Sequence, residues 1–166
     1  MPSAHTLAET EGRVVEKLGG LPLDFEAMSV VSNLFRAANA TRNYLERTVL
    51  APHGLSWTAF VVLWVTWIWE PIETRQIAEE GGFSKATLTG VLGTLEGKGL
   101  LQRSRSDRDG RLVTVSMTDA GRALMRELFP EFNEHERTIA GSVDADRRRE
   151  LADMLRFVTT VAEAQR

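Results

Sequence analysis

The sequence predicts a mostly α-helical chain that carries one small β-hairpin. Apolar residues recur at helical spacing over most of its 166 residues, which is the main sign of amphipathic helices. The glycine pair Gly81-Gly82 separates two short helical patterns. Further along, Asp109-Gly110 lies between two short runs that read as strands, and this pair is a strong hairpin signal. Helix, turn, helix and hairpin in this order predict a winged helix-turn-helix domain at residues 51–117.

Two helices are expected before this domain. The first runs from Leu7 to Leu18 and ends at Gly19-Gly20, and Asp24 is placed to cap a longer one from Phe25 to about Leu50. Long amphipathic helices beside a small domain need a partner for their apolar stripes. We therefore expect residues 1–50 to take part in dimerisation.

The next helix is apolar on all sides. Ser56 is placed to cap it, and Glu70-Pro71 is placed to end it after Trp69. Its length falls short of the ~20 residues that span a bilayer, so we expect it in the protein interior. It holds all four tryptophans of the chain. They either pack in the core or an interface, or they line a pocket for a planar aromatic ligand.

The helix-turn-helix follows. Thr74 is expected to cap a short helix to Glu80, Gly81-Gly82 ends it, and Phe83 pins the turn. Ser84 then caps a helix from Lys85 to about Lys98. Leucine and valine at i, i+3, i+4 and i+7 give this helix one buried face. That face consists of Leu88, Val91, Leu92 and Leu95.

The opposite face of this helix carries small residues. With Leu88 inward, Thr89 and Thr94 lie beside an outward row made of Ala86, Gly90, Gly93 and Gly97. Each glycine costs about 1 kcal/mol relative to alanine in a helix interior. Two interpretations stay open: close approach of the backbone to DNA, with threonine methyl groups on thymine, or a frayed helix that reads sequence weakly.

The predicted hairpin is basic. Its arms are residues 101–105 and 112–117, and four arginines surround its loop: Arg103, Arg105, Arg108 and Arg111. Residues 84–111 hold six basic and three acidic side chains, a net charge of +3, although the whole chain has a net charge of −3. Positive charge confined to one segment favours contact with DNA phosphates. A solvated hairpin with spare charge is the alternative.

Two more helices are expected after the hairpin. Thr118 is placed to cap the first, which runs to about Ile139 and is expected to be interrupted at Pro130. Asp144 begins the last helix, which has an apolar stripe at helical spacing. We expect residues 118–166 to complete the dimer region.

Four sequence runs together carry a family resemblance. They are Gly82 to Thr89, Leu95 to Leu101, Asp109-Gly110-Arg111 and Met117 to Gly121. They resemble the MarR family of bacterial transcriptional regulators, over roughly Phe25 to Val161. The resemblance implies a homodimer that binds palindromic operator DNA, usually as a repressor released by a small ligand. It also implies that the helix after Ser84 enters the major groove, and that Arg111, oriented by Asp109, reaches the minor groove.

The chain departs from the family at one point and has one addition. Related proteins often carry long polar or basic side chains where Gly90 and Gly93 stand. The extra helix before Gly19 resembles a subgroup that responds to urate-like or carboxylate metabolites.

Two sets of candidate site residues follow. The DNA-binding set is Ser84, Lys85, Thr87, Thr89, Thr94, Arg103, Arg105, Arg108, Asp109 and Arg111. The ligand-binding set is Arg36, Asn39, Arg42, Asn43, Trp57, Trp64 and Arg75. Arginine beside tryptophan suits an anionic aromatic or carboxylate ligand. A polar seam filled with water and internal ion pairs is the alternative for the second set.

Several function classes are not supported. The chain has no cysteine and three scattered histidines, so we expect no metal site. No nucleophile–base pair, phosphate loop or dinucleotide motif is recognisable, so we expect neither catalysis nor a cofactor. No secretory leader opens the sequence, which favours a cytoplasmic protein. The alternative to a DNA-binding regulator is a winged-helix protein-interaction module whose basic hairpin binds an acidic partner.

Overall fold

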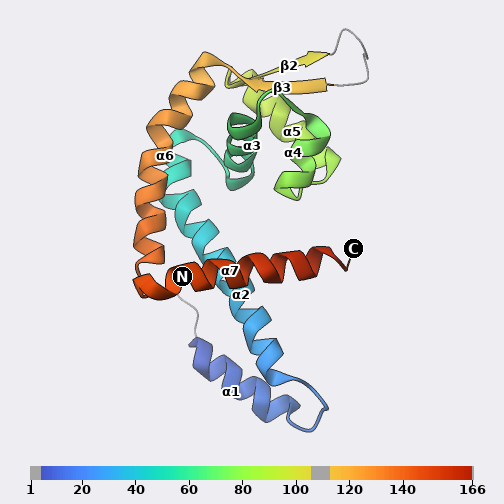
Figure 1. Ribbon diagram of the computed structural model, residues 1–166, viewed down its shortest axis with the longest axis vertical. Helices are drawn as coiled ribbons and strands as arrows, with labels where there is room; N and C mark the ends of the chain where they lie inside the picture. The colour runs from blue at the N-terminus through green and yellow to red at the C-terminus, as the bar shows by residue number, and fades with distance from the viewer. Residues whose placement is uncertain (1–4, 106–112, 166) are drawn as a thin grey trace. The chain divides into compact units, whose positions relative to one another are not determined.

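The computed structural model describes residues 5–105 and 113–165. The chain divides into two compact units, Met1–Asn43 and Tyr44–Arg166, and each is described by itself (Figure 1). Helices dominate, and a small antiparallel sheet of three strands accompanies them. The predicted class, mostly α with a winged helix-turn-helix, is confirmed.

The first unit consists of α1 (Leu7–Leu18) and most of α2 (Phe25–Leu45). Both helices begin at local side-chain caps. Thr6 and Glu9 form a reciprocal capping box at α1. Asp24 Oδ1 accepts the Ala27 N–H at 2.9 Å at the start of α2, as the sequence predicts. Past Leu45 the helical path continues as a π turn, Glu46–Leu50, and a 3-10 turn, Ala51–His53.

A polar cluster joins α1 to α2. Glu11 Oε1 accepts hydrogen bonds from Ser29 Oγ at 3.0 Å and from Asn33 Nδ2 at 2.7 Å. The Asn33 hydrogen bond, followed by that of Ser29, lowers the pKa of the Glu11 carboxyl from its usual value. Large apolar side chains of α2 remain exposed, with Val30, Val31 and Phe35 at 57%, 50% and 66%.

The second unit is built around α3 (Trp57–Trp69). Ser56 Oγ caps this helix by accepting the Ala59 N–H at 3.2 Å. Its Val62 and Leu63 side chains are fully buried, because α4, α5, α6 and β3 all pack against it. The predicted interior position is confirmed. Within the described ranges, no individual helix is both long and apolar enough to cross a membrane.

The helix-turn-helix consists of α4 (Thr74–Gly81) and α5 (Lys85–Gly97). The predicted cap at Thr74 is wrong, because Thr74 is already the first helical residue and the extended Glu73 precedes it. The Glu73 N–H donates to Gln76 Oε1 at 3.2 Å. Gly82 closes α4 with φ 65°, a left-handed conformation that glycine adopts without strain. Ser84 Oγ accepts the Thr87 N–H at 3.1 Å and begins α5.

The hairpin belongs to a three-stranded sheet of order β1-β3-β2. The strands β2 (Leu101–Arg105) and β3 (Val113–Met117) pair antiparallel, with Leu101 opposite Met117 and Arg103 opposite Val115. The third strand, β1 (Ile72–Glu73), pairs with β3 and was not predicted. It is two residues long, so it leaves no alternation pattern in the sequence.

Two helices follow the sheet, α6 (Asp119–Ala140) and α7 (Ala145–Glu163). Thr118 Oγ1 accepts the Gly121 N–H at 3.0 Å and caps α6 as predicted. The predicted interruption at Pro130 is wrong, because α6 runs through it. Leu128 and Phe132 are buried in the core on either side of Pro130, and this packing stabilises the helix across the missing N–H.

Candidate nucleic-acid interface

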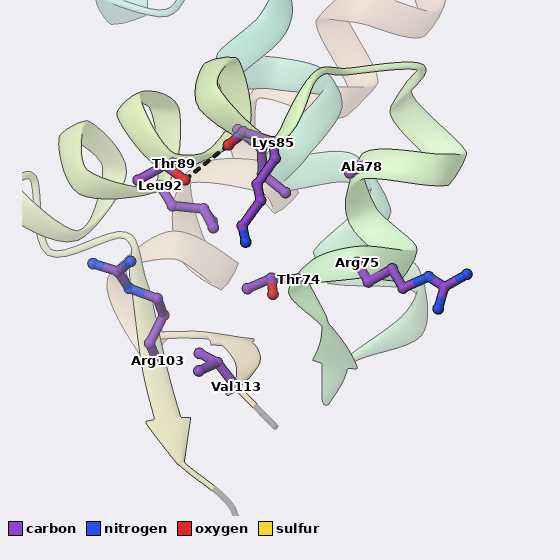
Figure 2. Close-up of a pocket in the computed structure, with 9 residues that line it drawn as sticks. Thr74, Arg75, Ala78, Lys85, Thr89, Leu92, Arg103 and Val113 are labelled. Carbon is purple, nitrogen blue, oxygen red and sulfur yellow. Dashed lines mark hydrogen bonds between the residues drawn. The ribbon is translucent and has the colours of Figure 1, made fainter. Parts of the chain in front are cut away.

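A cleft of about 410 Å³ opens where the helix-turn-helix meets the sheet. Its lining residues come from α4, α5, β2 and β3 (Figure 2): Thr74, Arg75, Ala78, Lys85, Leu88, Thr89, Leu92, Arg103 and Val113. The lining therefore combines three cationic side chains with apolar ones. The cations are Arg75, Lys85 and Arg103, and the apolar residues are Ala78, Leu88, Leu92 and Val113. In Figure 2 the Arg75 guanidinium points away from the other residues drawn. In the same view the Lys85 ammonium points toward Thr74, and the Arg103 guanidinium lies on the opposite side from Arg75.

The exposed face of α5 carries short side chains, as predicted. Thr89 Oγ1 donates to Lys85 O at 2.8 Å, and Thr94 Oγ1 donates to Gly90 O at 3.0 Å. Both hydroxyl protons are therefore used within the helix, while the oxygens can still accept. A Cβ added at Gly90 or Gly93 would meet no described atom within 4 Å. The glycines are therefore open to solvent and are not needed for packing inside the chain.

Arg103 lies in a hairpin arm, as the predicted arm 101–105 implies. It lies on β2 opposite Val115, which is fully buried, so both side chains lie on the same face of the sheet. The Arg103 guanidinium forms an ion pair with Glu96 of α5. The Arg103 N–H also donates to Glu96 Oε1 at 3.1 Å. A signal for this existed, because Leu101 and Arg103 are two residues apart and share one face of the strand.

The Glu96–Arg103 contact shifts the pKa of both groups. The side-chain hydrogen bond from Arg103 is the largest influence on Glu96 and lowers the pKa of its carboxyl. The same bond raises the pKa of the Arg103 guanidinium above its usual value. Both side chains therefore stay charged over a wider pH range than they would alone.

Other cations of the predicted basic segment differ in how they are placed. Lys98 Nζ donates to the Gly54 carbonyl oxygen at 2.6 Å and so anchors the end of α5. Arg105 belongs to β2. Arg108, Asp109 and Arg111 lie outside the described residues.

A second ion pair joins the sheet to α6, and sequence reasoning missed it. Glu70 Oε2 accepts the Met117 N–H at 2.7 Å and Arg122 Nη2 at 2.8 Å, while Glu70 Oε1 accepts Arg122 Nε at 3.0 Å. One carboxylate thus joins the end of α3 to β3 and the first turn of α6. Glu70 and Arg122 are 52 residues apart, so no local sequence pattern predicts the contact.

The predicted ligand-binding residues fall in both units, and they stay a prediction as a set. Arg36, Asn39, Arg42 and Asn43 belong to the first unit, and Trp57, Trp64 and Arg75 to the second. Trp64 stacks on Phe129 of α6, with ring centroids 4.5 Å apart. Trp57 lies 6.4 Å from the Phe132 ring, between centroids. Both tryptophans thus contact aromatic side chains of α6.

Arg75 has a different environment from the tryptophans. Its Nε donates to Glu79 Oε1 at 2.8 Å, and this bond is the main cause of a raised Arg75 pKa. Arg75 lines the cleft beside Lys85, and neither Trp57 nor Trp64 is among the described residues that line it. Within the described ranges, no three His, Asp or Glu side chains gather as a metal site would require.

Comparison with known proteins identifies the family. The model of the MarR family matches residues 55–113. The HTH-type transcriptional regulator YwaE of Bacillus subtilis is 41% identical over 155 residues, which are 92% of this chain and 91% of YwaE. Such identity over nearly the whole length of both proteins shows common family membership.

Solved structures agree in fold. BpsR of Bordetella bronchiseptica, whose DNA binding is regulated by 6-hydroxynicotinic acid, gives a TM-score of 0.72 at 25% identity, over 78% of this chain and 98% of BpsR. Sco3205 of Streptomyces coelicolor, a MarR family regulator solved in complex with DNA, gives 0.75 at 18% identity, over 82% of this chain and 88% of Sco3205. YwaE is a transcriptional regulator, which favours that function over a protein-interaction module. The chain belongs to the MarR family of DNA-binding transcriptional regulators.

Proposed function

We propose that this regulator is a homodimeric repressor that binds an inverted-repeat operator and leaves it when an anionic aromatic or carboxylate ligand binds. The observation that carries the DNA contact is the cleft at which Lys85, Thr89 and Arg103 come together from two elements. Cations on a helix and a strand at one edge of a small domain suit phosphates on both sides of a groove.

In this proposal α5 enters the major groove. Ser84, Lys85 and Thr87 lie in its exposed first turn, where backbone N–H groups favour a phosphate. Thr89 and Thr94 offer methyl groups to thymine and oxygens as acceptors. Arg103 and Arg105 contact phosphates from β2. On the family resemblance, Arg111 is assigned to the minor groove and Asp109 to orienting it, and Arg108 is a further proposed DNA contact.

Exposed apolar stripes support the homodimer. In α7, Leu151, Met154, Leu155, Phe157 and Val161 are between 40% and 71% exposed. Val30, Val31 and Phe35 of α2 are exposed to a similar degree. Stripes of this kind on long helices are typical of an interface, and a second copy of the chain is the simplest partner.

The ligand class rests on the arginines and on one relative. BpsR, at 25% identity, is regulated by 6-hydroxynicotinic acid, which is an aromatic carboxylate. Guanidinium groups of the kind that bind such an anion are present at Arg36, Arg42 and Arg75. Asn39, Asn43, Trp57 and Trp64 complete the proposed set. The dimer has one conformation that binds DNA and another in which the spacing of its two α5 helices does not fit the operator. A ligand that binds the second conformation more tightly lowers the operator affinity, by the difference between its affinities for the two conformations.

Selection of duplexes from a random-sequence pool tests the DNA part of the proposal. We expect the protein to enrich an inverted repeat with half-site centres about 10 bp apart. Lys85→Ala should weaken binding to that repeat and lessen its salt dependence. Arg137→Ala, which removes the same charge from an exposed ion pair of α6, is the matched control and should bind as wild type. Equal affinity for all duplexes would contradict the proposal.

The release of DNA by a ligand is tested on the selected duplex. Titrating 6-hydroxynicotinic acid and benzoate into the protein–DNA complex should release the DNA with at least one of them. Arg42→Ala should then need more of the active compound and leave binding without ligand unchanged. DNA retention at saturating concentrations of both compounds would contradict this ligand class.

A further inference from the structure

Glu96 contacts one residue of the hairpin, Arg103, in two ways. Its Oε1 accepts the backbone N–H of Arg103 at 3.1 Å, and its Oε2 accepts the Arg103 guanidinium through Nη2. A single carboxylate on α5 therefore fixes both the main chain and the side chain of a β2 residue. No other described contact joins these two elements through charged side chains.

The register of the sheet determines on which face the Arg103 side chain lies. Because Arg103 lies opposite the buried Val115, its side chain starts on the face of the sheet that covers α5. The Arg103 side chain lines the cleft together with Leu92 and Val113, and it is 37% exposed. An arginine at this position has many rotamers, and the ion pair with Glu96 selects those that direct its charge toward α5.

We propose that Glu96 is a positioning residue that holds the Arg103 guanidinium beside α5, ready for a DNA phosphate. This inference rests on the proposed DNA-binding role of α5 and β2. A guanidinium has five donors in one plane, and Glu96 accepts from Nη2. The group therefore retains donors for a second oxyanion. Holding the side chain in one rotamer before DNA arrives removes part of the ordering cost of binding.

The carboxylate also has an opposing effect, because its negative charge repels a phosphate. Glu96 is 26% exposed, and solvent at a partly exposed site weakens this repulsion. The hydrogen bonds that orient Arg103 are short-ranged and directional. Because Glu96 orients Arg103, removing Glu96 should weaken operator binding even though the protein becomes less acidic.

A double-mutant cycle on the full chain tests this inference. The duplex is the one that the wild-type protein selects from a random pool, and the variants are Arg103→Ala, Glu96→Ala, Glu96→Gln and the double alanine variant. Arg103→Ala should weaken binding about 10-fold and lower the slope of log affinity against log salt by about 1. Glu96→Ala should weaken binding several-fold and lower the same slope. The double variant should bind no more weakly than Arg103→Ala, because Glu96 acts through Arg103.

Two further variants separate positioning from folding. Glu96→Gln keeps an acceptor for the Arg103 N–H but loses the charge, so it should stay folded, lose less stability than Glu96→Ala, and still bind the duplex more weakly than wild type. Glu134→Ala removes a carboxylate from the exposed Arg137 pair of α6 and should leave the salt slope unchanged.

The outcomes are distinguishable. Additive losses for Glu96→Ala and Arg103→Ala, or tighter binding by Glu96→Gln, would overturn the positioning role while the regulator's DNA binding stands. If Arg103→Ala binds the duplex with wild-type affinity, Arg103 makes no phosphate contact. Absence of any preferred duplex for the wild-type protein would instead overturn the proposed function.

Discussion

At the scale of single residues, Gly121 shows how closely α6 approaches the sheet. The Thr118 N–H donates to the Leu100 carbonyl oxygen at 3.1 Å, and Thr118 Oγ1 donates to the Gly99 oxygen at 2.6 Å. A Cβ added at Gly121 would lie 2.1 Å from that Leu100 oxygen. Since the obstacle is backbone, a side chain at position 121 would displace the first turn of α6.

We therefore expect Gly121→Ala to lower the free energy of unfolding by about 1–3 kcal/mol, as overpacking does. Gly93→Ala is the matched control, because its Cβ would meet no described atom within 4 Å. It should raise the free energy of unfolding by about 1 kcal/mol through helix propensity. Urea unfolding measures both, and equal effects would contradict this account of the junction. The operator affinity of Gly93→Ala also separates the two interpretations of the glycine face, since it falls only if the backbone approaches DNA closely.

The Glu96–Arg103 pair predicts a pH dependence at the same scale. Arg103 lowers the folded-state pKa of Glu96 below its usual value of 4.5. The stabilisation is therefore fully present above the unfolded-state pKa and is lost as pH falls through the lower folded-state pKa. The difference in unfolding free energy between wild type and Glu96→Gln should be constant from pH 7 to about 5.5 and shrink below about pH 4. A difference that grows on acidification would contradict the pairing.

At the scale of elements, Glu70 joins three segments that sequence separates. Its carboxylate binds the Met117 N–H of β3 and the guanidinium of Arg122 on α6, from its own place at the end of α3. The Glu70 side chain is 18% exposed and that of Arg122 34%. These contacts tie the first turn of α6 to β3 through a single carboxylate.

We expect Arg122→Ala to lower the free energy of unfolding by about 1–2 kcal/mol, because it leaves a largely buried carboxylate with one partner. Arg137→Ala is the control, since its pair with Glu134 is 72% and 64% exposed, and it should cost less than about 0.5 kcal/mol. Thermal or urea unfolding measures both variants. A cost for Arg122→Ala as small as the control's would show that the junction does not depend on this ion pair.

The elements also show what a sequence can and cannot predict. The caps at Asp24, Ser56 and Thr118 were predicted because capping is decided within four residues. The strand β1 was missed because its pairing partner lies some 40 residues further along the chain and is not a local signal. The Glu70–Arg122 pair was missed for the same reason, since its partners are 52 residues apart. The Glu96–Arg103 pair spans only seven residues, and it was missed because it depends on how β2 packs against α5.

At the scale of the whole molecule, both units expose stripes of large apolar side chains to water. Phe35 of the first unit is 66% exposed and Phe157 of the second 71%. A second copy of the chain that covers these stripes would remove them from water and bring two α5 helices to one duplex.

Phe157→Glu should therefore shift the protein from dimer to monomer and weaken operator binding at least 10-fold, because a buried charge without a partner is costly. Sedimentation velocity and a titration of the selected duplex measure the two effects. The exposed Ile68, which lies in the second unit outside these stripes and is 49% exposed, offers the control Ile68→Glu. A dimer that survives Phe157→Glu unchanged would place the interface elsewhere.

The central claim is that two copies of α5, each with its Lys85 and Arg103 cations, bind one duplex together. Hydroxyl-radical footprinting of the wild-type protein on its selected duplex tests it most directly. We predict two protected regions related by a two-fold axis, with centres about one helical turn apart, and loss of both together in Phe157→Glu. A single protected region, or two that are lost independently, would contradict the claim.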